Sequence, residues 1–239
     1  MKLRSLLVNF ALGIVPLFTA GAASAQTVFL IGDSTVSNFS PPDPRNGWGQ
    51  VIGRNFASDV VVKNFARSGR SSKSFFEEGA WAPVVPMLKP GDYVFIQFGH
   101  NDEKRDAERG TEPYSTYQEY LSRYIDDTLK AGAIPILVTP VGRGGLKKSS
   151  GPGSHGRYPD AMLELAKQRK LLSIDLTSLS EAYFRKLGTS DTLKLFVASI
   201  DGKDDTHFLP AGAVAIANLV SQAIKGLDIP LAQKVVITE

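Results

Sequence analysis

The chain lacks cysteine and has only three histidines among its 239 residues. Without cysteine, neither a disulfide framework nor a thiolate metal site can form, so the folded core has to be stable without covalent cross-links. The three scattered histidines show no H-E-x-x-H pattern, which argues against a catalytic zinc site, and no Walker lysine motif indicates a nucleotide site. We therefore expect no metal site and no nucleotide site.

Acidic residues are absent from residues 1–25, which begin with Lys2 and Arg4 and continue with an apolar stretch over 6–22. The segment ends in the sequence A-S-A at Ala25, which matches the cleavage signal of a secretory peptide. Asparagine and proline interrupt a stretch that is already short for a membrane anchor. We expect a signal peptide over 1–25, cleavage after Ala25, a secreted or periplasmic protein, and no membrane span after cleavage.

The chain also lacks a strong excess of charge of either sign. It has 27 Lys and Arg against 24 Asp and Glu, and loss of Lys2 and Arg4 with the signal peptide lowers the formal net charge from +3 by two, to +1. This balance argues against a nucleic-acid partner. A chain of this length with 43% hydrophobic residues is sufficient for one sizeable core. We expect a single domain over 26–239 and a monomer.

Apolar, β-branched runs alternate with amphipathic stretches along the mature chain. The runs predict strands over 27–31, 60–63, 93–98, 134–139 and 172–176. The amphipathic stretches predict helices over 48–57, 114–131, 159–170, 178–187 and 210–225. Continuous apolar runs are typical of parallel strands that are buried on both faces, so we expect an α/β fold with an open, doubly wound parallel sheet. Sites in such sheets form beyond the carboxyl ends of the strands, where loops 38–46 and 141–156 are expected to lie.

A serine and a histidine at opposite ends of the chain are candidates for nucleophilic catalysis. Ser34 follows the first predicted strand, and His207 precedes the last predicted helix. A serine hydroxyl becomes a good nucleophile when an imidazole takes its proton, and the imidazole needs a carboxylate to fix its tautomer and orientation. Asp204 lies three residues before His207 and could be that carboxylate, and the neighbouring Asp205 competes for the role.

Backbone and amide donors follow the first three predicted strands. Gly69 lies after the second strand and Asn101 after the third, and the backbone N–H of Ser34 is free to donate in the turn after the first. An asparagine amide and two backbone N–H groups that converge on one point can stabilise a tetrahedral oxyanion. We expect Ser34, Gly69 and Asn101 to form this oxyanion hole, and His100 to support it by packing or hydrogen bonding.

Substrate contacts are expected from Trp48, Arg70, Arg143 and His155. Trp48 could stack on a sugar ring or anchor its helix in the core, and we favour the anchor; His155 could touch substrate or face water. Two basic clusters follow the second and fourth predicted strands, and no Asp or Glu lies between Arg143 and Arg157. These clusters form either a positive rim that concentrates an anionic ligand or an ordinary solvated surface. They are Arg67, Arg70 and Lys73, and Arg143, Lys147, Lys148 and Arg157.

Four ordered motifs resemble those of the SGNH hydrolases, also called the GDSL family. They lie at 32–35, 64–69, 99–102 and 204–207. The fuller strings G-D-S-T-V at 32–36, G-W-G-Q at 47–50, G-H-N-D at 99–102 and D-D-T-H-F at 204–208 look like the rhamnogalacturonan acetylesterase branch. The resemblance covers essentially the whole mature chain. It implies a flavodoxin-like three-layer α/β/α sandwich with five parallel strands and no cofactor. It assigns the nucleophile to Ser34, the oxyanion donors to Gly69 and Asn101, and the base to His207; its acid, three residues before the histidine, favours Asp204.

The resemblance implies hydrolysis of acetyl esters on plant cell-wall polysaccharide, most specifically on rhamnogalacturonan. Three alternatives remain at this stage. An acetylxylan esterase would use the same machinery on another polysaccharide. A lysophospholipase or thioesterase would need an apolar groove, which the heavily charged stretch 103–118 disfavours. A non-catalytic pectin-binding protein would have no need for the complete set of catalytic residues.

Overall fold

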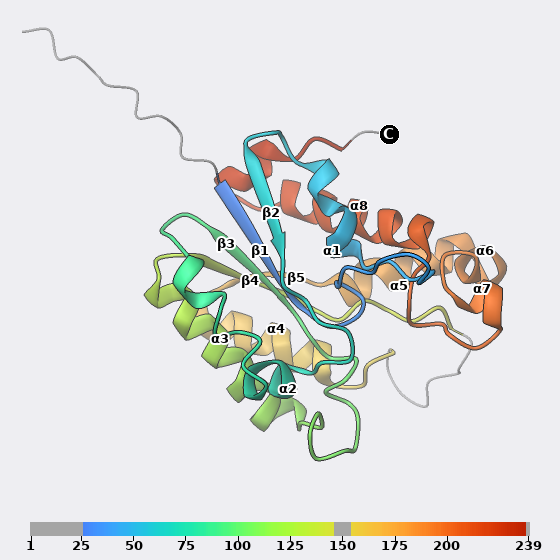
Figure 1. Cartoon of the computed structure of the whole chain (residues 1–239), viewed down its shortest axis with the longest axis horizontal. Helices are drawn as coiled ribbons and strands as arrows, with labels where there is room; N and C mark the ends of the chain where they lie inside the picture. Colours follow the sequence, from blue (N-terminus) through green and yellow to red (C-terminus); the bar gives the residue numbers. More distant parts are fainter. Residues whose placement is uncertain (1–25, 146–153, 238–239) are drawn as a thin grey trace, which may run out of the picture.

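The structure is a computed structural model that describes residues 26–145 and 154–237. The predicted signal peptide, Lys147 and Lys148 lie outside the described residues. Five strands form one parallel sheet in the order β2-β1-β3-β4-β5 (Figure 1). This confirms the predicted sheet, with strand ends within two residues of those expected. The strands are β1 (Gln26–Gly32), β2 (Val60–Asn64), β3 (Tyr93–Gln97), β4 (Ile134–Val138) and β5 (Leu172–Ile174).

Helices cover both faces of the sheet and give a three-layer α/β/α sandwich, as expected. One face packs against α1 (Trp48–Val51), α5 (Leu176–Leu187) and α8 (Pro210–Lys225), and the other against α2 (Ser72–Glu77), α3 (Gln118–Lys130) and α4 (Tyr158–Arg169) (Figure 1). Successive strand side chains point to opposite faces, so Val28 and Leu30 join one core while Phe29 and Ile31 join the other. Both cores bury their strands, which explains the continuous apolar runs.

Short helical segments depart from the prediction. The helix expected over 48–57 is α1 followed by the 3-10 turn η1 (Ile52–Asn55), and the helix expected over 114–131 begins with the π-helical turn η3 (Pro113–Tyr117). A helix of one or two turns has too few residues to show an apolar period, so α2 and four other short elements gave no signal. These four are η2 (Val85–Met87), α6 (Thr189–Leu193), α7 (Ala198–Asp201) and η4 (Pro230–Lys234).

The strand order reverses between β1 and β3, and this reversal positions the candidate site. From β1 the chain goes outward to β2, then returns past β1 to β3 on its other side. Loops that leave β1 and β3 therefore diverge at their carboxyl ends, where ligands bind in sheets of this kind. Ser34 and Asn101 lie directly after these two strands. Within residues 26–145 and 154–237, no helix is long and apolar enough to cross a bilayer.

Candidate active site

Ser34 lies in a tight turn that begins where β1 ends. The carbonyl of Asp33 accepts hydrogen bonds from the N–H groups of Val36 and Ser37, and the Asp33 carboxylate accepts from both the N–H and the hydroxyl of Thr35 at 2.8 Å. These bonds close the chain around Ser34 and fix the direction of its side chain. Its hydroxyl points to the imidazole of His207, with Oγ 2.9 Å from Nε2.

The imidazole of His207 bridges Ser34 and a carboxylate. Its Nδ1 lies 2.7 Å from Oδ2 of Asp204, while Oδ1 of the same carboxylate accepts the backbone N–H groups of Thr206 and His207. Burial alone would raise the pKa of Asp204, but these N–H donors and the imidazole outweigh it and hold the pKa below its usual value. Asp204 is therefore the carboxylate in contact with the imidazole. Asp205 is buried, and its backbone carbonyl accepts the N–H of Gly144.

The loop that carries Asp204 and His207 is fastened to the segment before α7. The N–H of Val197 donates to the carbonyl of His207, and the N–H of Ala198 donates to that of Asp204. Phe208 follows the histidine and is buried in the core, where its carbonyl accepts the N–H of Asn46. The histidine is thus held at both sides by backbone bonds, so its ring is set by the fold and by Asp204 together.

Two backbone N–H groups near the Ser34 hydroxyl have no acceptor among the described residues. They belong to Ser34 itself and to Gly69, in the loop after β2. Gly69 has φ +78, which glycine adopts without strain, and an added Cβ there would meet no atom within 4 Å. The requirement for glycine is therefore one of backbone conformation, which turns the Gly69 N–H relative to the rest of the loop.

Asn101 adds a side-chain amide to this pair of donors. One N–H of its amide donates to the carbonyl of Arg70 at 3.1 Å, and the other has no acceptor in the described part of the chain. Two residues earlier, Gly99 has φ +145, and a Cβ at that position would lie 2.7 Å from Pro140. This glycine allows the loop after β3 to pass close to the loop after β4, which carries Asn101 toward Gly69.

A cavity of about 390 Å³ lies over these residues. Among the described residues, its lining contains no aliphatic side chain and no Phe, Tyr or Trp. Ser34, Gly69, Asn101, Asp204 and His207 all contribute to it, so the structure brings together the residues that the sequence motifs singled out. The remaining lining residues are Arg45, Ser68, His100, Lys104, Arg143, Lys203, Asp205 and Thr206.

A second cavity, of about 880 Å³, adjoins the first. Lys104, Arg143, Asp205 and Thr206 line both cavities, so the two share this wall. The larger cavity is bounded on its far side by α5 and α6, through residues such as Phe184 and Thr189. A ligand much larger than an acetyl group therefore has space beside Ser34.

Arg143 is the predicted substrate contact that lines the site. Its guanidinium forms an ion pair with Glu103, donates to the carbonyl of Ser154 at 2.8 Å, and lies 3.3 Å from the hydroxyl of Thr206. It therefore connects the loop after β3 to the loop that carries His207. Burial opposes ionisation of Glu103, but His155 and Arg143 dominate and lower its pKa to about 2.

Trp48, His155 and Arg70 do not occupy the positions expected of substrate contacts. Trp48 is fully buried and donates its indole N–H to Gln97 at 2.8 Å, as the core-anchor interpretation requires. His155 is 1% exposed, and its Nε2 lies 2.8 Å from the carbonyl of Val141. Arg70 pairs with Glu78 at 2.7 Å and does not line either cavity. Trp48 and His155 are thus buried, and Arg70 is engaged in an ion pair outside the two cavities.

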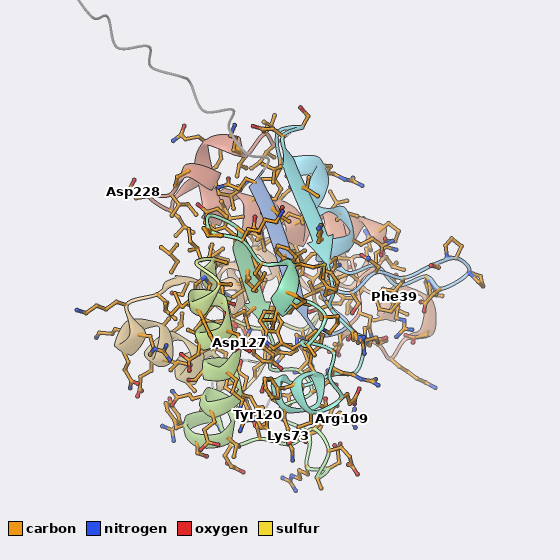
Figure 2. All side chains as sticks on the ribbon, turned by 60° about the vertical axis from the view of Figure 1, so that its left-hand side comes forward. Phe39, Lys73, Arg109, Tyr120, Asp127 and Asp228 are labelled. Atoms are coloured by element: carbon orange, nitrogen blue, oxygen red, sulfur yellow. The ribbon has the colours of Figure 1, made fainter. Side chains whose placement is uncertain are left out.

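Sequence reasoning missed Arg45, Lys104 and Lys203, which line the smaller cavity. Arg45 pairs with Asp43 and lies 4.4 Å above the ring of Phe39, which Figure 2 places on the loop between β1 and α1. Lys104 and Lys203 have no ion-pair partner among the described residues. Their positions in the sequence could have indicated this, because Lys104 lies three residues after Asn101 and Lys203 lies directly before Asp204.

Asp33 and His100 form a buried pair behind the nucleophile. Nδ1 of His100 lies 3.3 Å from Oδ2 of Asp33, and both side chains are almost completely shielded from solvent. Burial lowers the pKa of His100 to about 4, which keeps the ring neutral near pH 7. The pKa of Asp33 lies below its usual value because His100 and Thr35 outweigh burial. His100 therefore supports the Ser34 turn rather than replacing His207.

The fold and this constellation define a hydrolase of the GDSL class. Residues 30–215 match the model of the GDSL-like lipase/acylhydrolase family, and the chain belongs to that family. It is a carboxylic ester hydrolase, as the resemblance of its motifs predicted.

Individual relatives narrow the comparison. The chain is 41% identical over 224 residues to the rhamnogalacturonan acetylesterase RhgT of Bacillus subtilis, covering 89% of this chain and 95% of that protein. It is 38% identical to the probable rhamnogalacturonan acetylesterase YesY of the same organism, covering 89% and 98% of the two chains. The crystal structure of the YxiM protein of Bacillus subtilis superposes with a TM-score of 0.77 at 33% identity, over 86% of this chain and 58% of that one.

Proposed function

We propose that this protein is an exported serine esterase that removes acetyl groups from plant cell-wall polysaccharide, most specifically from rhamnogalacturonan. The observation that carries the proposal is the continuous relay from Ser34 Oγ to His207 Nε2 at 2.9 Å and from His207 Nδ1 to Asp204 at 2.7 Å. The polysaccharide is inferred from the two acetylesterase relatives that match nearly the whole chain. Residues 1–25 direct export, and the mature protein begins at Gln26.

In the first half of the reaction, Ser34 attacks the acetyl carbonyl carbon while His207 takes the hydroxyl proton on Nε2. Asp204 accepts the hydrogen bond from Nδ1–H and stabilises the positive imidazolium that forms. The carbonyl oxygen becomes an oxyanion, which the N–H groups of Ser34 and Gly69 and the amide of Asn101 stabilise. Collapse of this intermediate breaks the bond to the sugar oxygen, and His207 donates its proton to that leaving hydroxyl.

In the second half, water releases acetate from the acetyl-enzyme. His207 is neutral again after protonating the sugar, so Nε2 removes a proton from a water molecule as its oxygen attacks the acetyl carbon. The same three donors stabilise the second oxyanion. Transfer of the proton back to Ser34 Oγ regenerates the enzyme, and acetate leaves.

The smaller cavity favours a short acyl group and a polar alcohol. Its described lining consists of polar, charged and glycine residues, so a long hydrocarbon chain would gain little from burial there. A sugar ring, in contrast, offers hydroxyl groups to the surrounding charged side chains. This observation supports an acetylesterase over a lysophospholipase or thioesterase.

Basic residues around the cavity support an acidic polysaccharide. Arg45, Lys104, Arg143 and Lys203 all line it, and the ammonium groups of Lys104 and Lys203 are not balanced by an ion pair in the described part of the chain. A positive rim attracts a carboxylate-bearing glycan even when the whole protein is nearly neutral. Galacturonate-containing pectin carries such carboxylates, whereas chitin and xylan made of neutral sugars do not.

Acetate release from acetylated rhamnogalacturonan, acetylated xylan and chitin oligomers, measured side by side, tests the substrate. The proposal predicts the highest kcat/KM on rhamnogalacturonan. A higher kcat/KM on xylan would leave the proposed mechanism intact and show that xylan, and not rhamnogalacturonan, is the substrate. Acetate and octanoate esters of one chromogenic alcohol test the acyl group, and a preference for octanoate would overturn the acetylesterase assignment.

A pectin-binding protein without catalysis makes the opposite prediction for the same materials. It would bind acetylated oligosaccharide and release no acetate, and Ser34→Ala would bind as tightly as the wild type. The proposal predicts that the wild type releases acetate and that Ser34→Ala retains the oligosaccharide without deacetylating it.

Mass measurement of the exported protein checks the predicted start at Gln26.

A further inference from the structure

Asp102 is a buried carboxylate that connects the two loops of the oxyanion hole. It lies directly after Asn101 and is completely shielded from solvent. Its Oδ1 and Oδ2 both lie 3.1 Å from the backbone N of Ser72, and Oδ1 also accepts the Ser72 hydroxyl. Ser72 follows Gly69 by three positions and is the first residue of α2. The carboxylate thus joins the segment that supplies the Asn101 amide to the segment that supplies the Gly69 N–H.

A second bond joins the same two loops on the side of the cavity. The amide of Asn101 donates to the carbonyl of Arg70, the residue next to Gly69, at 3.1 Å. The two connections lie close together in sequence, because Asn101 contacts Arg70 while its neighbour Asp102 contacts Ser72, two residues further along. Together they fix the distance and the angle between the Gly69 N–H and the Asn101 amide.

The loops are also held from behind by buried hydroxyl groups. Tyr158 donates to the backbone carbonyl of Asp102 at 2.9 Å, and Thr111 donates its N–H to the same carbonyl at 3.0 Å and lies with its hydroxyl 3.3 Å from Oδ1. Tyr124 donates to the carbonyl of Ser72 at 2.5 Å. These contacts keep Asp102 and Ser72 in place, so the carboxylate has little freedom to follow a displaced loop.

We propose that Asp102 is a positioning residue that sets the geometry of the oxyanion hole by holding the Gly69 loop against the Asn101 loop. It does not touch substrate, since it is fully buried and lines neither cavity. Donors stabilise an oxyanion only when they are aimed at the place where the charge develops, and small displacements cost about 100-fold in rate. This inference rests on the proposed function, because it concerns an oxyanion formed from Ser34.

Asp102→Asn is the direct test, because asparagine has almost the same shape but presents an amide NH2 where one carboxylate oxygen accepted the Ser72 N–H. We expect kcat on p-nitrophenyl acetate to fall by about 10- to 100-fold with KM within about 2-fold, since transition-state donors are displaced while ground-state binding is kept. Ser72→Ala, which removes the hydroxyl and keeps the N–H, is expected to act in the same direction by a smaller factor. Ser72→Ala therefore tests the same connection if Asp102→Asn does not fold.

Asp127→Asn is the matched control. Asp127 on α3 accepts the indole N–H of Trp81 at 2.9 Å and lines neither cavity (Figure 2). This variant likewise exchanges a hydrogen-bonded carboxylate for an amide, so it reports the effect of that exchange at a position that lines neither cavity. We expect its kcat to stay within about 2-fold of the wild type.

A double-mutant cycle with Asn101→Ala distinguishes positioning from a general structural effect. Loss of Asn101 alone is expected to cost about 100- to 1,000-fold in kcat. If Asp102 acts through the oxyanion hole, Asp102→Asn costs several-fold less in the Asn101→Ala background than in the wild type. Equal factors in both backgrounds, or a loss of kcat that Asp127→Asn reproduces, would overturn the inference. A wild type without activity on p-nitrophenyl acetate would instead overturn the proposed function.

Discussion

Ser34 Oγ lies 2.9 Å from His207 Nε2, although the two residues are 173 positions apart in the chain. Ser34 belongs to the turn after β1, and His207 belongs to the loop before α8. Backbone bonds hold this loop to Val197 through His207 itself and to Asn46 through the next residue. No local segment fixes this contact. It depends on the packing of the last helix against the sheet, so the catalytic pair forms only in the complete fold.

Removal of either member of this pair is expected to abolish turnover. Ser34→Ala and His207→Ala should each lower kcat by about 10⁴- to 10⁶-fold, because the hydroxyl is not activated without the imidazole and the imidazole has no nucleophile without the hydroxyl. The double variant should lose little more than either single one. Steady-state kinetics on p-nitrophenyl acetate measure all three, and independent, multiplying losses would contradict a shared step.

Asp204 and Asp205 make different contacts and should respond differently to the same substitution. Asp204→Asn removes the charge beside Nδ1 and presents an N–H to the ring, so kcat should fall by about 1,000- to 10,000-fold. Asp205→Asn leaves the 2.7 Å contact between His207 and Asp204 in place and should cost far less. The ratio of the two kcat values checks the assignment, and a larger loss in Asp205→Asn would reverse it.

Trp48 should behave as part of the core. Its indole N–H donates to Gln97, whose amide in turn donates to the hydroxyl of Thr35 at 2.6 Å. Trp48→Phe leaves the Gln97 carbonyl oxygen without its donor, so the free energy of unfolding should fall by about 1–3 kcal/mol, with KM nearly unchanged. Urea unfolding and oligosaccharide kinetics give the two values. A raised KM with unchanged stability would show that Trp48 contacts the sugar after all.

Asp102 should also give the protein a characteristic dependence of stability on pH. Burial raises its pKa to about 7 from 3.8, despite the donors of Ser72, and the nearby charge of Asp33 adds to the rise. The folded state then binds this proton more tightly than the unfolded state. Its contribution to stability is complete below about pH 4 and is lost as pH rises through about 7, by on the order of 4 kcal/mol.

Asp102→Asn removes this titration, so the variant should lose less stability than the wild type when pH rises from about 4 to about 8. Urea unfolding of both proteins at the two pH values measures the difference directly, and other titrating groups contribute almost equally to both. A difference in unfolding free energy that is the same at both pH values would show that folding does not raise the pKa of Asp102.

Lys104 and Lys203 should contribute to the binding of an acidic glycan and to little else. Replacement of either by glutamine should raise KM for acetylated rhamnogalacturonan by about 2- to 5-fold, as expected for an exposed charge pair, and leave hydrolysis of p-nitrophenyl acetate unchanged. Lys225→Gln, at the exposed end of α8, is the matched control. If all three variants kept the wild-type KM for acetylated rhamnogalacturonan, the basic rim would have no role in recognition.

The sequence was sufficient to predict the sheet and many of the residues that meet around the smaller cavity, for reasons that particular residues illustrate. Continuous apolar runs such as β3, where every residue is buried, indicate strands between two helical layers. Ser34, Gly69 and Asn101 each follow a strand, and parallel strands direct such residues to one edge. The contact of Asp204 with His207 follows from a spacing of three residues within one loop, which the family motif had favoured.

The substrate residues were harder to predict, because their environment is set by distant parts of the chain. Trp48 is buried by packing between α1 and the sheet, which a G-W-G-Q motif does not reveal. His155 is enclosed through contacts with Val141, Arg143 and His100. Arg70 pairs with Glu78, from the end of α2, a helix too short to be anticipated. In contrast, Lys104 and Lys203 line the cavity because their neighbours Asn101 and Asp204 do.

Covalent labelling of the active protein with a fluorophosphonate, followed by peptide mapping, tests the central claim most directly. The account predicts one phosphonyl group per chain, attached to Ser34, with esterase activity lost in proportion to labelling and no labelling in His207→Ala. An adduct on another residue, or full activity that survives complete modification of Ser34, would contradict it.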